Sequence, residues 1–202
     1  MLLSLLLPLA SAEISKRHNS RNPNQHKSHS TYKHSSIQDS YNLQYTQNGV
    51  FDSIPQEIRP TEDTLLAKTF AVGTQNYKCI ASRWELESVD ANLSKDRHTL
   101  ENVQVSYYFL PTKDPDGGQP TWMYLNDYST FTGKPVAKSV VDPNSIPWVL
   151  ISRTSGSTSG VMSKVSSVLR VHTQGGNPPA SGCQEGQSSR VGFTAEYWFF
   201  TK

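Results

Sequence analysis

The sequence predicts an all-β protein, a single-domain β-sandwich or barrel-like fold that follows a disordered N-terminal tail. From about Thr64 onward, short alternating or apolar runs are separated by turns rich in Gly, Pro, Asp and Asn. The chain ends on a long alternating run, from Arg190 to Phe200. After the tail is set aside, about 150 residues remain, which is enough for one hydrophobic core.

The first twelve residues predict an export signal. Leu2 to Leu9 form a short apolar run, and Ala10-Ser11-Ala12 fits the small-residue rule for cleavage after Ala12. The run is too short to span a bilayer as a helix, which needs roughly 20 apolar residues. An N-terminal strand is the alternative, but it would lead into a polar tail with nothing to pack against. We therefore expect a secreted, extracellular protein without a membrane span.

Residues 13–48 form a low-complexity basic tail rich in His, Ser and Asn. Such a composition cannot bury enough apolar surface to offset the entropy of ordering, so we expect disorder. The dibasic pair Lys16-Arg17 is a candidate processing site, with two solvated charges as the alternative. Four tail histidines could bind Cu²⁺ or Zn²⁺ weakly, but a flexible site must offset its own ordering. We expect no metal site and no cofactor. These histidines are His18, His26, His29 and His34.

The remaining body is close to neutral in charge. Once the tail is removed, 14 of the 19 basic residues and 15 of the 17 acidic residues are left. The mild basicity of the chain therefore belongs to the tail, and no nucleic-acid footprint is expected on the domain. We expect a monomer.

Eight runs between the turns have the pattern of strands. One of these segments competes with a helix, because Val161, Val165, Val168 and Leu169 share a helical spacing. Its Ser-rich flanks and β-branched content favour a strand, with a short helical turn at its start as the alternative. The expected strands are Leu65–Val72, Gln75–Ala81, Val103–Leu110, Thr121–Asn126, Pro135–Val141, Trp148–Ser152, Val165–Thr173 and Arg190–Phe200.

The last strand has two distinct faces. One face is uniformly apolar and is expected to lie in the core: Val191, Phe193, Ala195, Tyr197 and Phe199. The other face mixes Thr194 and Glu196 with Trp198 and Phe200. We expect a neighbouring segment to cover the aromatic end of this second face.

Cys79 and Cys183 are the only cysteines, 104 residues apart. Given the export signal we predict a disulfide between them, with two buried free thiols as the alternative. Such a bridge would contribute about 4–5 kcal/mol in the chain-entropy model. No Cys-x-x-Cys pair is present, so neither a zinc site nor a thioredoxin-type redox motif is indicated.

Four motifs follow one another in the second and last thirds of the chain: Gly73 to Cys79, Ile146 to Leu150, Leu169 to Cys183, and Phe193 to Phe199. Together they resemble domain-of-unknown-function family 3455, found in secreted bacterial and fungal proteins. The resemblance covers roughly residues 60–201 and implies a secreted β-rich domain of no established activity. The form Gly-Thr-Gln-Asn-Tyr-x-Cys resembles that of fungal members. A Gly-x-His-Tyr-like segment of the family has no histidine in this chain.

No motif identifies a reaction. A dehydrogenase would need a Gly-rich turn between a strand and a helix, but Gly117-Gly118 and Gly175-Gly176 lie in Pro-rich turns with no helix after them. A triad built on His98 or His172 lacks a Gly-x-Ser-x-Gly elbow. Hydrolysis by paired carboxylates needs two carboxyl groups about 5–10 Å apart, and the sequence alone does not place the candidates, which are expected mainly to be solvated charges on strand faces. The candidates are Glu85, Glu87, Asp90, Asp127 and Glu196.

A binding module is the favoured interpretation, with a secreted hydrolase or metal-dependent enzyme as the alternative. Tyr124, Asn126, Asp127 and Tyr128 near a turn could form a platform for one face of a sugar. We therefore expect an extracellular or cell-wall interaction with a polysaccharide or small ligand. The sequon at Asn92 is a candidate N-glycosylation site and predicts a surface loop there.

Overall fold

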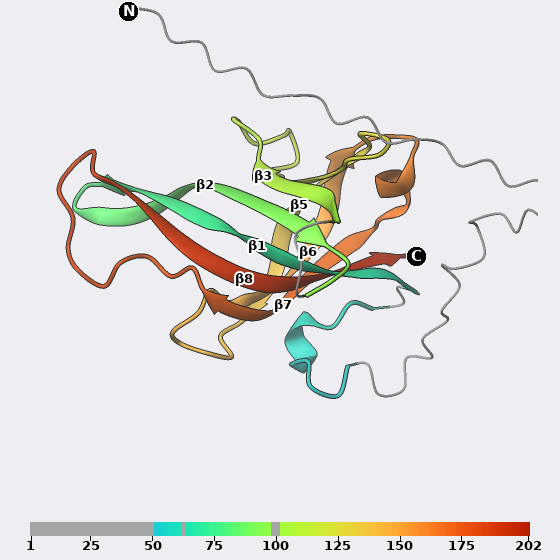
Figure 1. The fold of residues 1–202 in the computed structure, drawn as a ribbon, viewed down its shortest axis with the longest axis horizontal. Helices are drawn as coiled ribbons and strands as arrows, with labels where there is room; N and C mark the ends of the chain where they lie inside the picture. Colours follow the sequence, from blue (N-terminus) through green and yellow to red (C-terminus); the bar gives the residue numbers. More distant parts are fainter. Residues whose placement is uncertain (1–50, 62–63, 98–101) are drawn as a thin grey trace, which may run out of the picture. The chain divides into compact units, whose positions relative to one another are not determined.

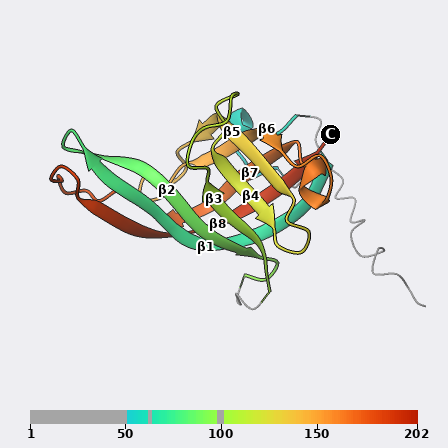
Figure 2. The same ribbon diagram turned by 90° about the horizontal axis from the view of Figure 1, so that it is seen from above.

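The computed structural model describes residues 51–61, 64–97 and 102–202. These residues form eight antiparallel strands that close into one barrel, in which each strand pairs with the next and β8 pairs with β1 (Figures 1 and 2). The all-β prediction is confirmed, and the architecture is the barrel-like one. The strands are β1 Thr64–Ile80, β2 Arg83–Ser94, β3 Val103–Phe109, β4 Pro120–Tyr124, β5 Thr130–Ser139, β6 Trp148–Gly156, β7 Ser167–Gly175 and β8 Ser188–Thr201.

Several predicted features lie outside the described residues. Within those residues, no helix has both the length and the apolar character needed to cross a membrane. The features outside are the export signal with Ala12, the basic tail with Lys16-Arg17, the four tail histidines, and His98.

Two expected strands are one continuous strand, β1. Gly73 and Thr74 do not form a turn between them, because Gly73 lies in the middle of the ladder, opposite Ala91 of β2 and Phe193 of β8. A Cβ atom added at Gly73 would come within 2.3 Å of the Ala91 Cβ. The glycine therefore permits close approach of two strands rather than a reversal of the chain.

Strand β2 was not predicted. Its first half, from Arg83 to Glu87, alternates charged residues with Trp84 and Leu86, but none of these five residues is buried. Strand β5 begins at Thr130, five residues before the expected start at Pro135. The segment with helical spacing divides into a short 3-10 turn, η3 (Val161–Lys164), followed by β7, as the alternative for its start allowed.

The barrel interior is filled by side chains. Phe193, Ala195, Tyr197 and Phe199 of β8 are buried there, which confirms the predicted core face for these four residues. Tyr107 stacks on the indole of Trp122 with ring centroids 4.5 Å apart, and Tyr197 lies 5.3 Å from Tyr107. An eight-stranded barrel has an interior just wide enough for such packing.

A second apolar cluster lies on the outside of the barrel. Trp198 and Phe200 of β8 are 3% and 0% exposed, because residues 51–58 pack over them. Phe51 stacks on Phe200 at 5.9 Å, and Ile54 and Ile58 of the same segment are buried in the cluster. Figures 1 and 2 show the η2 turn (Gln56–Ile58) in cyan against this side of the barrel. The prediction that a neighbouring segment covers the aromatic end of β8 is confirmed.

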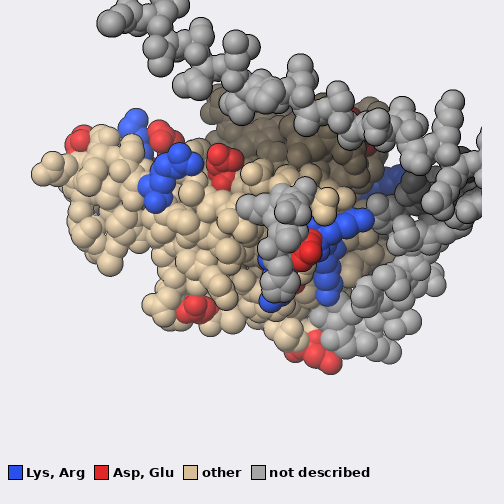
Figure 3. All heavy atoms as spheres, in the orientation of Figure 1, with Lys and Arg blue, Asp and Glu red and all other residues tan. Residues whose placement is uncertain are grey.

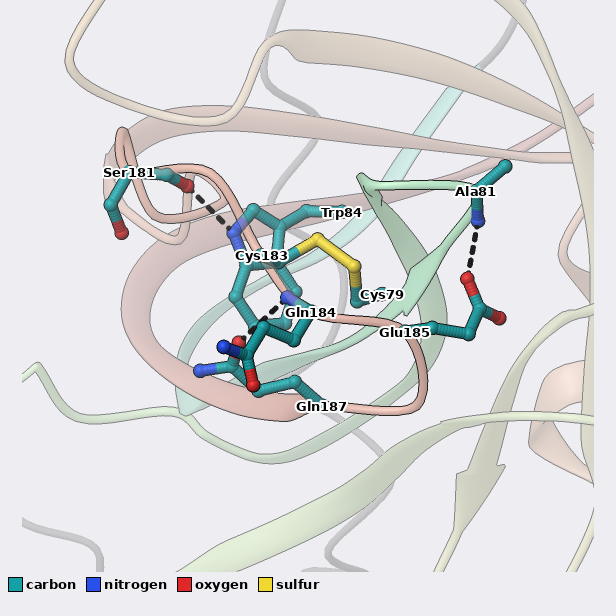
Figure 4. The surroundings of a disulfide bond; sticks show 8 residues. All are labelled: Cys79, Ala81, Trp84, Ser181, Cys183, Gln184, Glu185 and Gln187. Atoms are coloured by element: carbon teal, nitrogen blue, oxygen red, sulfur yellow. Dashed lines mark hydrogen bonds between the residues drawn. A yellow bond between two sulfur atoms is a disulfide. The ribbon is translucent and has the colours of Figure 1, made fainter.

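The β1–β2 hairpin and the start of β8 project as an arm beyond strands β3 to β7 (Figure 2). The predicted disulfide is present: Cys79 is bonded to Cys183, with their Cα atoms 5.8 Å apart. Around it, the Trp84 indole donates a hydrogen bond to the Ser181 carbonyl at 3.1 Å, and the Ala81 amide donates to Glu185 (Figure 4). The bridge therefore ties the loop before β8 to the end of β1.

The Gly175-Gly176 turn is a structural corner. Both glycines have positive φ, 70° and 80°. The Gly176 carbonyl accepts a hydrogen bond at 2.6 Å from the buried Tyr77 hydroxyl, which connects the corner to β1. The segment from this turn to β8 contains no helix, so the helix N-terminus that a dinucleotide site needs is not present there.

Candidate functional site

Glu196, on the outer face of β8, is the most enclosed carboxylate among the described residues. Its side chain is 10% exposed and has contacts from three directions. One carboxylate oxygen, Oε1, forms an ion pair with the Arg97 guanidinium and lies 3.2 Å from Nδ1 of His172. The other, Oε2, accepts a hydrogen bond from the Trp198 indole at 2.9 Å. A carboxylate in such a position is fixed in orientation.

The β8 ladder places Glu196 and Trp198 side by side. Residues two apart on a strand share a face, so the indole reaches back to the carboxylate. His172 comes from β7, where the register with β8 shifts between Val171 and Gln174. At this bulge His172 has a φ of 50°, in the left-handed region. Bulges redirect side chains, and this one places the imidazole against the carboxylate.

The imidazole of His172 lies among aromatic rings. Its centroid is 4.9 Å from the Trp148 ring and 6.0 Å from the Trp198 ring, both with edge-to-face geometry. Its side chain is nevertheless 40% exposed. The histidine is therefore positioned by neighbours yet open to solvent.

Cations surround the carboxylate. Arg97 follows β2, and its guanidinium carbon lies 4.9 Å from the Phe70 ring centroid. The Lys68 ammonium lies 3.7 Å above the Trp198 ring. Burial lowers the pKa of Lys68, an effect that the nearby charge of Glu196 partly opposes. Elsewhere, on the face shown in Figure 3, acidic and basic side chains are scattered rather than gathered into one basic patch.

An open groove of about 530 Å³ includes this constellation. We call it the Glu196 groove. Its walls combine an aromatic ring, an exposed aliphatic side chain, hydrogen-bond donors and hydroxyl or amide groups, which is the composition of a site for a small polar ligand. Besides Glu196, the lining side chains used below are Phe70, Val72, Arg97, His172, Gln174 and Thr194.

The predicted sugar platform lies elsewhere, on the turn between β4 and β5. The Tyr124 hydroxyl accepts a hydrogen bond at 3.0 Å from the Asn126 amide, and Tyr128 is 71% exposed with a φ of 57°. The carboxylate of Asp127 accepts hydrogen bonds from the backbone and hydroxyl of Ser129 and from the Val161 amide. These hydrogen bonds lower the pKa of Asp127. Asp127 thus connects the turn to η3, and Tyr128 is its most exposed ring.

The remaining predicted residues are dispersed. Glu85, Glu87 and Asp90 are exposed along β2, and Glu87 forms an ion pair with Lys78 at 3.7 Å. Among the described residues, no group of three or more His, Cys, Asp or Glu side chains is placed to hold a metal ion. Asn92 lies within strand β2, so the expected surface loop is wrong, although its side chain is exposed. Its glycosylation stays a prediction.

Three of the four tryptophans pack in the two apolar clusters. Trp122, Trp148 and Trp198 are buried, and so is Tyr107. Sequence reasoning did identify His172 and Glu196 as separate candidates, but it gave no reason to join them. It missed Phe70 and Arg97, whose part in the groove depends on barrel closure and on a segment 99 residues from Glu196. No local pattern marks either residue.

Comparison with known proteins gives a family without a described activity. Neither the curated proteins nor the solved structures that were compared contain a significant match to this chain. One family model, described as a protein of unknown function (DUF3455), matches residues 60–201, which include the whole barrel from β1 to β8. The chain belongs to this DUF3455 family.

Proposed function

We propose that this protein is an extracellular binding module that takes a carbohydrate, or a small hydroxyl-rich ligand of similar chemistry, in the Glu196 groove. The observation that carries the proposal is the enclosed carboxylate of Glu196, fixed by Arg97, His172 and Trp198 at an open groove. A rigid polar group beside open space is pre-organised for a ligand, since its orientation does not have to be restricted on binding.

The walls of the groove suit a sugar. A sugar presents hydroxyl groups that both donate and accept hydrogen bonds, together with an apolar ring face. Gln174 and Thr194 supply polar groups that can donate and accept, while Val72, which is 45% exposed, supplies apolar surface. The guanidinium of Arg97 has five N–H donors, of which one contacts Glu196.

The extracellular location rests on two independent features. The apolar run ending in Ala10-Ser11-Ala12 has the form of an export signal. The bond between Cys79 and Cys183 is of a kind that persists in oxidising compartments and is rare in the cytosol. Both features support a protein that meets its ligand outside the cell.

The test is binding of the full secreted chain to a glycan array and to cell-wall polysaccharides, followed by calorimetry with a bound oligosaccharide. We expect Arg97→Gln to weaken binding by at least about tenfold, the effect of losing one charge-assisted hydrogen bond. Arg190→Gln is the matched control, because Arg190 lies on the same strand as Glu196 but in the exposed arm, where it donates to Thr74. Absence of binding by the unmodified chain, or equal affinity of the two variants, contradicts the proposal.

The β4–β5 turn is the second candidate, favoured by the exposure of Tyr128. Stacking of a sugar on this ring would be lost in Tyr128→Ala. If that variant loses binding while Arg97→Gln retains it, the ligand lies on the turn and not in the Glu196 groove.

A further inference from the structure

We propose that the Glu196 groove also has hydrolytic activity toward a carboxylic ester, with His172 as the general base that activates water. This inference rests on the proposed function, because it takes the ester to be an acyl group on a hydroxyl of the bound carbohydrate. The starting point is the imidazole: Nδ1 lies 3.2 Å from Glu196, and no hydrogen bond occupies Nε2 among the described residues. One ring nitrogen is thus oriented by a carboxylate while the other is open for proton transfer.

The backbone supports a specific role for this histidine. A φ of 50° is unfavourable for a residue with a Cβ, and such strain persists where the surrounding structure enforces it. Here Trp148 and Trp198 pack against the imidazole and the β7 bulge directs it to Glu196. Contact with the carboxylate does not by itself require an imidazole, since an amide side chain could donate to it as well. The feature peculiar to histidine is the second, basic nitrogen.

The composition of the groove selects the reaction. Glycoside hydrolysis uses two carboxyl groups about 5–10 Å apart, whereas Glu196 is the sole carboxylate among the described lining residues. Both cysteines are in the disulfide, so a thiol nucleophile is excluded. No described serine or threonine hydroxyl is hydrogen-bonded to His172. Water is therefore the nucleophile. The expected acyl substrate is an ester, because its alcohol leaves more readily than the amine of an amide.

The proposed step balances without an oxidant or a cofactor. Nε2 of His172 removes a proton from water as the water oxygen bonds to the carbonyl carbon, and the C=O electron pair moves to oxygen. The N–H groups of Arg97 that do not contact Glu196 are available to stabilise this oxyanion. When the C=O bond re-forms, the C–O bond to the alcohol breaks, and the imidazolium gives its proton to the departing oxygen. The products are a carboxylic acid and an alcohol.

Glu196 acts as a positioning residue in this scheme. Its carboxylate orients the imidazole through Nδ1 and would stabilise the imidazolium formed during the reaction, while Trp198 and Arg97 fix the carboxylate. Replacement by glutamine keeps the size of the side chain but removes the charge. Loss of the charge should lower kcat by a larger factor than it raises KM, because the other lining side chains of the groove remain. A merely structural role would instead lower the melting temperature and alter both constants together.

The experiment uses the full secreted chain with 4-nitrophenyl acetate and with an O-acetylated wall polysaccharide, measuring released nitrophenol or acetate. We expect turnover above the uncatalysed rate and a loss of about 10²-fold or more in His172→Asn, the usual share of a general base. Asparagine is chosen because it tolerates positive φ, which preserves the bulge. Arg190→Gln is expected to keep full activity.

Two further readouts separate the possible failures. Carbethoxylation of the native chain, located by mass spectrometry, should modify His172 if Nε2 is accessible. Binding of the polysaccharide without turnover, or turnover that survives in His172→Asn, overturns the hydrolytic proposal and leaves the binding function standing. Loss of both binding and turnover in the unmodified chain rejects both proposals.

Discussion

The outward face of β8 has two ends that differ in their surroundings. At one end, Trp198 and Phe200 lie under residues 51–58 and are almost fully buried. At the other end, Thr194 and Glu196 line a groove that the described part of the chain leaves open. The two ends touch, since the Trp198 indole donates to Glu196.

Under the proposed function, this difference separates stability from ligand binding along one strand. The covered end is apolar, and burying its aromatic rings removes a large apolar area from water. The open end gains little from hydrophobic burial, yet it has a carboxylate fixed by three contacts and a strained histidine. Both features cost stability, and such costs are typical of residues that bind a ligand or take part in a reaction.

Removing both ends together has the largest expected effect. Deletion of residues 196–202 takes away a stretch of β8 that pairs with both β1 and β7, and with it core and outer apolar residues. We expect no soluble secreted protein, measured by immunoblot of culture medium. A control that lacks Lys202 alone should be secreted normally, because that residue is exposed and lies after β8. Normal secretion of the longer deletion would show that the end of β8 is not required for folding.

Weakening the covered end alone should cost stability and spare binding. Ile58 is 0% exposed within the second apolar cluster, so Ile58→Ala should lower the free energy of unfolding by about 2–5 kcal/mol. Val136→Ala, at a side chain 51% exposed, should change it by less than about 0.5 kcal/mol. Urea unfolding gives both values, and calorimetry gives ligand affinity. A folded Ile58→Ala protein that has lost ligand affinity would break the division between the two ends.

A smaller change, in ligand affinity alone, is expected for a substitution at the rim of the Glu196 groove. Asn92 is exposed and lies opposite Val72, which lines the Glu196 groove. If Asn92 carries a glycan, that glycan begins beside the groove. Asn92→Gln should then raise affinity for a bulky polysaccharide by less than about tenfold and leave affinity for a short oligosaccharide unchanged. An equal change for both ligands would mean that the glycan does not act by steric hindrance.

Much of the fold could be predicted because its signals are local. The alternation of β8, the turn residues and the two cysteines predicted the strand, its core face and the disulfide. Strand β2 was missed because its alternation of Trp84 and Leu86 with charged residues is short, and its projecting half buries no face in the core. Gly73 suggested a turn between two strands, whereas it lies inside β1 and allows β2 to approach closely.

The candidate site could be predicted only in fragments. His172 and Glu196 can be selected from the sequence as titratable residues. Their contact depends on a bulge in β7, which no sequence pattern predicts. Arg97 reaches the same carboxylate from the segment after β2. Asp127, chosen for a sugar platform, instead forms hydrogen bonds that connect the β4–β5 turn to η3. Convergence of this kind is a property of the closed barrel and not of any segment.

The most direct test of the division along β8 is an NMR titration of the isotope-labelled full chain with an oligosaccharide selected by the glycan-array experiment. We predict amide shift changes at Val72, Gln174 and Thr194, together with changes in the imidazole signals of His172. The covered end, represented by Ile58, should be unaffected. Changes confined to Tyr128 and its turn, or centred on the covered end, would contradict the assignment of the ligand to the Glu196 groove.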